Sequence, residues 1–197
     1  MKKIMFNDKY GLTRAVLEGR KTQTRRFVTP SILQKAEQYQ VDYFNDTLDA
    51  LSKEEAIEEF SPYKVGEVVA IAQNYYTIFN DEPTVTKEAK EYAYRMGFRP
   101  EPSWGNKMFV RAKDMPHSIK ITNIRVERLQ DISDDDCEKE GVRRICHVSL
   151  NLDTYSVEDG GIEHLTPQEA YADLIDKISG KGTWKSNPWV FVYDFEF

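Results

Sequence analysis

The sequence predicts an α+β fold in which a small β-barrel carries helices packed over its ends. Segments with strand character alternate along the chain with segments of helical periodicity, and this interleaving favours a mixed fold. The chain has 197 residues, of which 40% are hydrophobic, so it can bury a full core without disulfides or metals. Neither a G-x-G-x-x-G motif nor a P-loop is present, which argues against the usual nucleotide-cofactor folds. We expect one domain over residues 1–197 that uses no cofactor.

The first thirty residues predict a strand, a helix and a second strand. Lys3–Phe6 has the character of a short opening strand. Tyr10–Glu18 places its apolar residues at helical spacing, and Gly19 suits the end of that helix. Thr22–Val28 is polar and β-branched, which is typical of a strand, and Pro30 closes it.

Two long segments on either side of the next strand are predicted to be insertions. Residues 31–60 are acidic and have helical periodicity, so we expect a helical insertion there. An apolar strand is predicted at Val68–Ala72, and Tyr75–Phe79 is predicted to continue it or pair with it. Residues 80–117 hold four of the eight prolines and are predicted to form a loop excursion with a short helix at Lys87–Tyr94.

The segment that follows predicts a long strand and then a short helix. Ile119–Leu129 alternates apolar and polar residues, which predicts a strand with a bulge near Thr122 and Asn123. Ser133 is a candidate N-cap, and three aspartates follow it in the first turn of a helix that Gly141 ends.

The last fifty residues predict a loop, a helix and a final strand. Residues 147–165 are predicted to be a loop. Thr166-Pro167-Gln168-Glu169 has threonine at the cap, proline at the first helical position and glutamate at the third, which predicts a helix start. Trp189–Phe197 alternates aromatic residues with valine and acidic residues, which predicts a strand with an aromatic inner face.

Charge is distributed unevenly along the chain. The net charge of −6 argues against strong, sequence-independent binding to long nucleic acids. Residues 1–30 nevertheless carry eight lysines and arginines against two acidic residues, whereas the remainder carries 19 against 31. A positive region on an acidic chain suits one small anionic ligand. The alternative is that these positive charges only form an ordinary solvent-exposed face of the first helix.

The cysteines and the hydropathy pattern indicate a cytoplasmic protein. Cys137 and Cys146 are too few for a disulfide framework and lack metal-type spacing to the three histidines, so we expect reduced thiols and no metal. The first residues lack the apolar run of a signal peptide, and no stretch reaches transmembrane length, so we expect no membrane association.

The segment Glu18–Arg26 is the most informative for function. Four cations lie within seven residues, namely Arg20, Lys21, Arg25 and Arg26. Their mutual repulsion is tolerable if an anionic ligand or an acidic partner lies among them, and that repulsion lowers the pKa of the lysine. An amine that is neutral part of the time accepts a proton, so this lysine is a candidate base.

The pattern Gly19-x-Lys21-x-x-Thr24-x-Arg26 resembles the G-x-K-x-x-[E/T]-x-R signature of the ASCH family, relatives of the PUA RNA-binding barrels. Three further blocks are similar to the family, the last two to its phage- and prophage-associated branch: Pro62–Val69, Ile121–Gly141 and Gly182–Val192. Together the four blocks cover about half of the chain, in the order that the family shows.

This resemblance implies a PUA-like barrel with a cleft for RNA or a modified nucleoside. Some compact members of the family are 4-acetylcytidine amidohydrolases, which remove an acetyl group from the base. The matching positions imply Lys21 as proton acceptor, Thr24 as nucleophile and Glu140 as proton donor. On a straight strand Lys21 and Thr24 would point to opposite faces, so this chemistry requires a turn just after Gly19.

Five further residues are candidate ligand contacts. Arg20, Arg25 and Arg26 supply positive charge for a phosphate. Tyr75 and Trp104 supply aromatic rings on which a base can stack.

Three functional hypotheses remain open from the sequence. The first is binding of RNA or a modified nucleotide in a basic cleft. The second is an amidohydrolase that removes an acyl group from a modified cytidine. The third is a protein-interaction module of mobile-element origin without ligand chemistry. A departure from the family motivates the third, because relatives of the phage branch show V-R-E-T-W where this chain has Ile71-Ala72-Gln73-Asn74-Tyr75.

Overall fold

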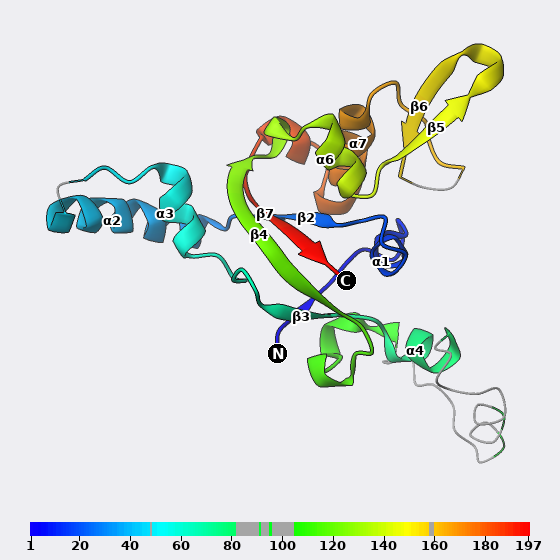
Figure 1. Cartoon of the computed structure of the whole chain (residues 1–197), viewed down its shortest axis with the longest axis horizontal. Coiled ribbons are helices and arrows are strands. Elements are labelled where there is room, and N and C mark those ends of the chain that lie inside the picture. Colours follow the sequence, from blue (N-terminus) through cyan, green and yellow to red (C-terminus); the bar gives the residue numbers. More distant parts are fainter. Residues whose placement is uncertain (48, 82–90, 92–94, 96–104, 158–159) are drawn as a thin grey trace. The chain divides into compact units, whose positions relative to one another are not determined.

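The computed structural model describes residues 1–47, 49–81, 91, 95, 105–157 and 160–197 (Figure 1). These residues form two compact units. Unit 1 comprises Met1–Phe6 and Val68–Ile119, and unit 2 comprises Asn7–Glu67 and Lys120–Phe197. Helices and strands are both present, so the predicted α+β class is confirmed. The predicted single domain over residues 1–197 stays a prediction.

Unit 1 is built on two parallel strands. β1 (Lys3–Ile4) pairs with β3 (Val68–Ile71), with Lys3 opposite Ala70. Its described residues also form helix α4 (Tyr75–Asp81) and the 3-10 turns η2 (Lys107–Phe109) and η3 (Ala112–Asp114). Its core is a small apolar cluster of Ala70, Ala72, Val110 and Met115.

The prediction of a strand at Tyr75–Phe79 is wrong, because this segment lies in helix α4. The side-chain oxygen of Asn74 accepts a hydrogen bond from the backbone N–H of Thr77 at 2.6 Å, as an N-cap does. Tyr75 and Ile78, three residues apart and so on one helical face, both pack against the apolar cluster. The helix expected at Lys87–Tyr94 lies outside the described residues except for Glu91.

Unit 2 contains an antiparallel sheet with the strand order β2–β7–β4. The strands are β2 (Gln23–Phe27), β7 (Trp189–Glu196) and β4 (Ser118–Arg128), whose first residues belong to unit 1. A register shift between Ile121 and Asn123 confirms the predicted bulge. Within unit 2 the described strands do not close into a barrel, so the predicted barrel stays a prediction.

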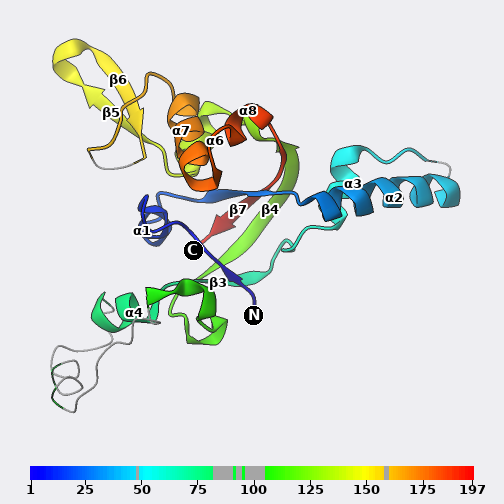
Figure 2. The same ribbon diagram turned by 180° about the vertical axis from the view of Figure 1, so that it is seen from behind.

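Strand β7 is buried on both faces at the centre of this sheet. Phe191 and Tyr193 are buried, as the predicted aromatic inner face requires, but Val190 and Val192 on the opposite face are fully buried too. Strands β2 and β4 flank β7, and on the face of Val192 the neighbouring Arg25 of β2 packs against the ring of Tyr171, which belongs to helix α7. The helices of unit 2 are α1 (Leu12–Leu17), α2 (Pro30–Thr47), α3 (Lys53–Glu59), α6 (Asp134–Lys139), α7 (Pro167–Ser179) and α8 (Thr183–Ser186), with 3-10 turns η4 (Leu129–Asp131) and η5 (Val148–Leu150). Helices α6 and α7 lie side by side in both ribbon views (Figure 2), and α6 contacts β2.

The predicted helix starts are confirmed by their caps. The Ser133 hydroxyl accepts a hydrogen bond from the N–H of Asp136 at the start of α6. Thr166 and Glu169 form a reciprocal capping box at the start of α7. Because these signals act within one helical turn, tertiary contacts do not override them.

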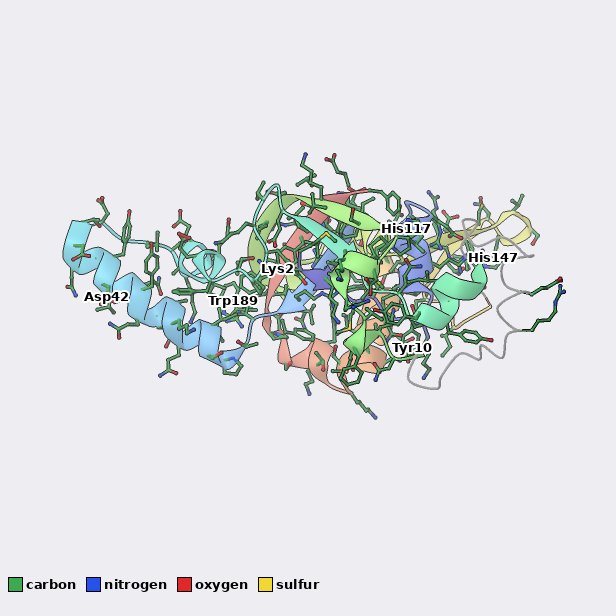
Figure 3. All side chains as sticks on the ribbon, turned by 90° about the horizontal axis from the view of Figure 1, so that it is seen from below. Lys2, Tyr10, Asp42, His117, His147 and Trp189 are labelled. Carbon is green, nitrogen blue, oxygen red and sulfur yellow. The ribbon has the colours of Figure 1, made fainter. Side chains whose placement is uncertain are left out.

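The segment 31–60, predicted to be helical, forms the helical pair α2 and α3. Ala36, Ala56 and Ile57 are fully buried between them, and the ring of Tyr39 meets that of Phe60 edge-on at 5.8 Å. Several further residues of α2, such as Tyr39, are half-buried. The others are exposed, among them Asp42, which is labelled on this helix in Figure 3.

The prediction of a loop over residues 147–165 is wrong in its first part. β5 (Arg143–His147) and β6 (Leu152–Ser156) form an antiparallel hairpin, and Asn151 adopts the left-handed conformation in the connection. Its strands carry mostly polar residues, such as the cross-strand pair of Arg144 and Asp153, so the pattern of apolar residues did not indicate it.

Candidate functional site

The chain turns sharply where helix α1 ends. Gly19 has φ of 72°, its N–H bonds the carbonyl of Val16, and the N–H of Arg20 bonds the carbonyl of Ala15. This is a Schellman ending, which a left-handed glycine favours. Lys21 therefore lies in the turn before β2, and the bend required just after Gly19 is present.

Lys21 and Glu140 form a buried ion pair. Their side chains are 2% and 5% exposed, and the Lys21 Nζ donates to Glu140 Oε2 and, at 2.8 Å, to the main-chain oxygen of Glu140. Glu140 is the C-cap of α6, and Gly141 beyond it has φ of 107°. A Cβ at Gly141 would lie 3.8 Å from Lys21 Cδ, so the glycine backbone packs closely over the pair.

Arg25 holds the other carboxylate oxygen of Glu140. Its guanidinium, 1% exposed, donates through Nη1 to Glu140 Oε1 at 3.1 Å and through Nη2 to Glu127 Oε1 at 2.7 Å. Asp136 Oδ2 lies 3.1 Å from the same Nη2 and also pairs with Arg125 at the solvent edge. We call this set the buried ion cluster: Lys21, Arg25, Arg125, Glu127, Asp136 and Glu140.

Burial and the cluster's own charges set the protonation of its members. Burial lowers the pKa of Lys21, and the neighbouring charge of Glu140 only partly opposes this. Burial also works against the charge of Arg25, but Glu140 and Glu127 outweigh it and raise the pKa of the guanidinium. Arg125 and the Gln23 side chain overcome the burial of Asp136 and lower its pKa. The lysine is therefore the member closest to losing its proton.

Thr24 and Arg26 lie on the face of β2 opposite to Arg25. They pair with Tyr193 and Phe191 of β7, and residues directly opposite in a ladder share a face. The Tyr193 hydroxyl is 2.9 Å from Ser61 Oγ. Thr24 is buried, and in the described part of the chain its hydroxyl makes no hydrogen bond to a side chain. Burial lowers the pKa of Arg26, whose charge in turn lowers the pKa of Lys21.

The structure thus brings together only some of the predicted site residues. Lys21, Glu140 and Arg25 meet in the buried ion cluster, where Arg25 lies inside the protein. Arg20 is on the surface with its Nη2 2.7 Å from Glu18. Tyr75 is in unit 1 and donates from its hydroxyl to Asp114 at 2.8 Å. Trp104 lies outside the described residues.

Three members of the cluster were missed by sequence reasoning, namely Arg125, Glu127 and Asp136. Arg125 and Glu127 stand two residues apart on β4, which places both side chains on one face of that strand. Asp136 appeared to be only a favourable charge in the first turn of α6, where it occupies the third position. The alternation on the strand was the available signal, because charged residues at i and i+2 on a predicted sheet face need partners.

Other kinds of site find little support in the described residues. No helix among them has the length and apolar character to cross a bilayer. Within the same ranges, no group of His, Cys, Asp and Glu side chains is arranged to hold a metal ion.

Comparison with models of protein families, with curated proteins and with solved structures finds no match to this chain.

Proposed function

We propose that this chain is an ASCH-type protein with a PUA-like barrel that binds RNA or a modified nucleotide. The observation that carries the proposal is the contact of Lys21 with Glu140, which are 119 residues apart. It joins the segment with the signature, Gly19–Arg26, to the end of another block of the resemblance, Ile121–Gly141. Burying two charges costs several kcal/mol per ion, and an apolar pair would stabilise the fold at least as well. A functional role accounts for keeping the pair.

The opposite face of β2 carries the groups that a nucleotide needs. Thr24 supplies a hydroxyl and Arg26 a positive charge. Tyr63 supplies a half-buried ring, which meets the ring of Tyr193 edge-on at 5.1 Å. A guanidinium binds phosphate through paired N–H groups, and an aromatic ring stacks on a base.

Binding is tested by titrating a labelled single-stranded RNA and a set of modified nucleosides, including 4-acetylcytidine. With few phosphate contacts, log affinity for RNA should fall with log salt with a slope of about −1 to −3. Arg26→Gln should weaken binding by roughly tenfold, the worth of one charged contact, whereas Lys35→Gln on the exposed face of α2 should not. Wild-type protein that binds neither RNA nor any nucleoside would defeat the proposal.

The second candidate function is hydrolysis of an acylated cytidine, and the Lys21–Glu140 contact favours it. Moving one proton from Lys21 Nζ to Glu140 Oε2 turns the ion pair into a neutral amine and a carboxylic acid. Burial, which lowers the pKa of Lys21, favours the neutral amine. A single proton shift therefore prepares both the base and the acid that the reaction requires.

The reaction balances with these groups alone and water. The reaction requires the Thr24 hydroxyl, which lies on the other face of β2 from Arg25, to come within reach of Lys21. The Lys21 amine then takes the hydroxyl proton as Oγ attacks the acetyl carbon. The carbon–nitrogen bond then breaks, and Glu140 gives its proton to the departing amino group of cytidine. Water next hydrolyses the acetyl ester on Thr24. One proton of the water restores the hydroxyl, and the other passes to the solvent as acetate is released. Lys21 and Glu140 end as the ion pair with which they began.

Hydrolysis is tested by following cytidine and acetate release from 4-acetylcytidine by chromatography. Thr24→Val keeps the β-branched shape of a buried strand residue but removes the nucleophile, so turnover should be lost while the fold persists. Lys21→Met should lower the rate by about 10²–10⁴, the contribution of a positioned base. If Thr24→Val retains the wild-type rate, the threonine is not the nucleophile. If wild-type protein releases no product, binding alone remains.

A further inference from the structure

A positively lined groove runs over the surface of unit 2 beside the buried ion cluster. It has two adjoining parts, which share Arg20, Gly141 and Arg143 in their walls. One part, of about 360 Å³, is bounded by α1 and the residues before it. The other, of about 430 Å³, is bounded by the end of α6 and the start of β5. Either part alone has the volume of a small-molecule site, so together they fit a longer ligand.

The groove is positive although the chain is acidic. Its walls carry three acidic residues and six cations, the latter being Lys9, Arg14, Arg20, Lys139, Arg143 and Arg144. The lining residues have an excess of three positive charges, whereas the whole chain has a net charge of −6. Two of these cations, Arg144 and Lys139, also pair with carboxylates outside the lining, those of Asp153 and Asp136. Hydrogen bonds from Arg20 and Arg14 lower the pKa of Glu18, so the groove keeps this excess with Glu18 ionised. A polyanion is the ligand that such a lining attracts.

The distribution of the cations indicates a chain of phosphates. They come from both walls and from both parts of the groove, rather than from one point. Four of the six are arginines, whose planar guanidinium matches the oxygens of a phosphate. Arg20 uses only Nε and Nη2 on Glu18, and a guanidinium has five N–H donors, so it can bind an anion without leaving Glu18.

The groove also passes next to the candidate site. Gly141 lines both parts and follows Glu140 directly. The aliphatic part of Lys21 lies under it, since a Cβ on Gly141 would be 3.8 Å from Lys21 Cδ. A ligand in the groove is therefore separated from the ion pair by little more than the glycine backbone.

We propose that this groove binds the sugar–phosphate backbone of single-stranded RNA, so that the site receives a nucleotide within a strand rather than a free nucleoside. The proposal rests on the proposed function, which it narrows to a polynucleotide ligand. A free nucleoside has no phosphate to engage these cations, and a mononucleotide has one.

The test compares two triple variants of the full chain that lose the same charge. Lys9→Gln, Lys139→Gln and Arg144→Gln neutralise exposed cations on both walls of the groove. Lys35→Gln, Lys181→Gln and Lys185→Gln neutralise three exposed lysines that do not line it. Fluorescence anisotropy measures binding of a labelled ten-nucleotide single-stranded RNA over a range of salt. Cytidine monophosphate and a ten-residue glutamate peptide serve as competitors.

The groove variant should bind RNA at least about tenfold more weakly than the wild type at low salt. The slope of log affinity against log salt should be shallower by about two, because each lost phosphate contact reduces it by roughly 0.7. Its preference for RNA over cytidine monophosphate should fall by the same factor. The control variant should bind RNA as the wild type does. Thermal melting of both variants checks that the fold is intact.

Three outcomes would overturn the proposal in different ways. If both variants bind RNA equally well, the groove is not the RNA track, while the proposed function stands. If the glutamate peptide displaces RNA at equal concentration, the groove binds acidic chains in general. If wild-type protein binds neither RNA nor the mononucleotide, the proposed function fails together with the groove.

Discussion

Replacing Lys21 by methionine should destabilise the fold by about 3 kcal/mol. Removing one partner of a buried ion pair costs about 3–5 kcal/mol, because the remaining charge is left without its counterion. Here Glu140 keeps a second partner, Arg25 Nη1 at 3.1 Å, which puts the cost at the lower end of that range. Methionine retains most of the volume of lysine, so little cavity forms. Lys21→Ala removes about three more methylenes at about 0.8 kcal/mol each and should cost about 5 kcal/mol.

Urea unfolding of a double-mutant cycle measures this pair directly. Lys21→Met, Glu140→Gln and the double variant are compared with the wild type at pH 7. We expect the double variant to be more stable than the sum of the single losses predicts, by about 2 kcal/mol, since residues in one ion pair couple by about 0.5–3 kcal/mol. Additivity within about 0.5 kcal/mol, the behaviour of distant sites, would refute the reasoning.

The pH dependence of the same variants supplies an independent check. Burial lowers the pKa of Lys21 in the folded chain, whereas the unfolded chain keeps the ordinary value of 10.5. Between these two values the unfolded chain binds more protons, so stability contributed by this group rises with pH. Lys21→Met lacks this rise, and the stability difference between wild type and variant should grow with pH in that window. The raised pKa values of Tyr171 and Tyr193, caused first by burial, act in both proteins and cancel in the difference. A difference that does not change up to pH 10.5 would contradict the lowered pKa of Lys21.

Three further predictions concern other parts of unit 2. Burial raises the pKa of the Cys137 thiol to about 12, whereas Cys146 is exposed. A thiol reagent added to the native protein at pH 8 should therefore modify Cys146 and leave Cys137 intact, and fast reaction of both thiols would contradict the burial of Cys137. Thr166→Ala removes half of the α7 capping box and should lower the free energy of unfolding by about 1 kcal/mol, measured in urea; no change would show that the cap does not support the helix. The stability that Asp136 contributes through its lowered pKa is present above about pH 4 and is lost as the pH falls through that pKa, so Asp136→Asn should flatten the acid limb of the stability curve. An unchanged acid limb in this variant would mean that Asp136 is not a source of acid sensitivity.

Local signals in the sequence were sufficient for the helix starts and for the long strand. Ser133 and Thr166 act within one turn of the helices that they cap, so their effect does not depend on distant residues. Tyr75–Phe79 was misassigned because its aromatic residues suit a strand equally well. The apolar cluster against which Tyr75 and Ile78 pack includes Val110 and Met115, which lie more than thirty residues away in the sequence. The hairpin after Arg143 was missed because polar pairs, not apolar alternation, hold its strands.

The candidate site was predictable only in part, because some of its residues come from distant parts of the sequence. The crowding of four cations in Glu18–Arg26 is tolerable if an acidic partner or an anion lies among them, and the resemblance supplied Glu140. Glu127 and Asp136 were not identified, because they reach Arg25 across gaps of 102 and 111 residues. Single-sequence periodicity carries no information on which strand and helix will meet over such distances.

The buried ion cluster also determines how the cations of Glu18–Arg26 divide their roles. Carboxylates of the acidic part of the chain neutralise Lys21 and Arg25 internally, so these two cannot also attract a phosphate. In the proposed function, the electrostatic attraction of the ligand is therefore assigned to Arg26 on the other face of β2 and to the groove cations around Arg20. It follows that substitutions should separate into two classes. Changes in the cluster should alter stability and proton transfer with little effect on the salt dependence of binding, whereas changes in the groove should alter the salt dependence and leave the stability nearly unchanged.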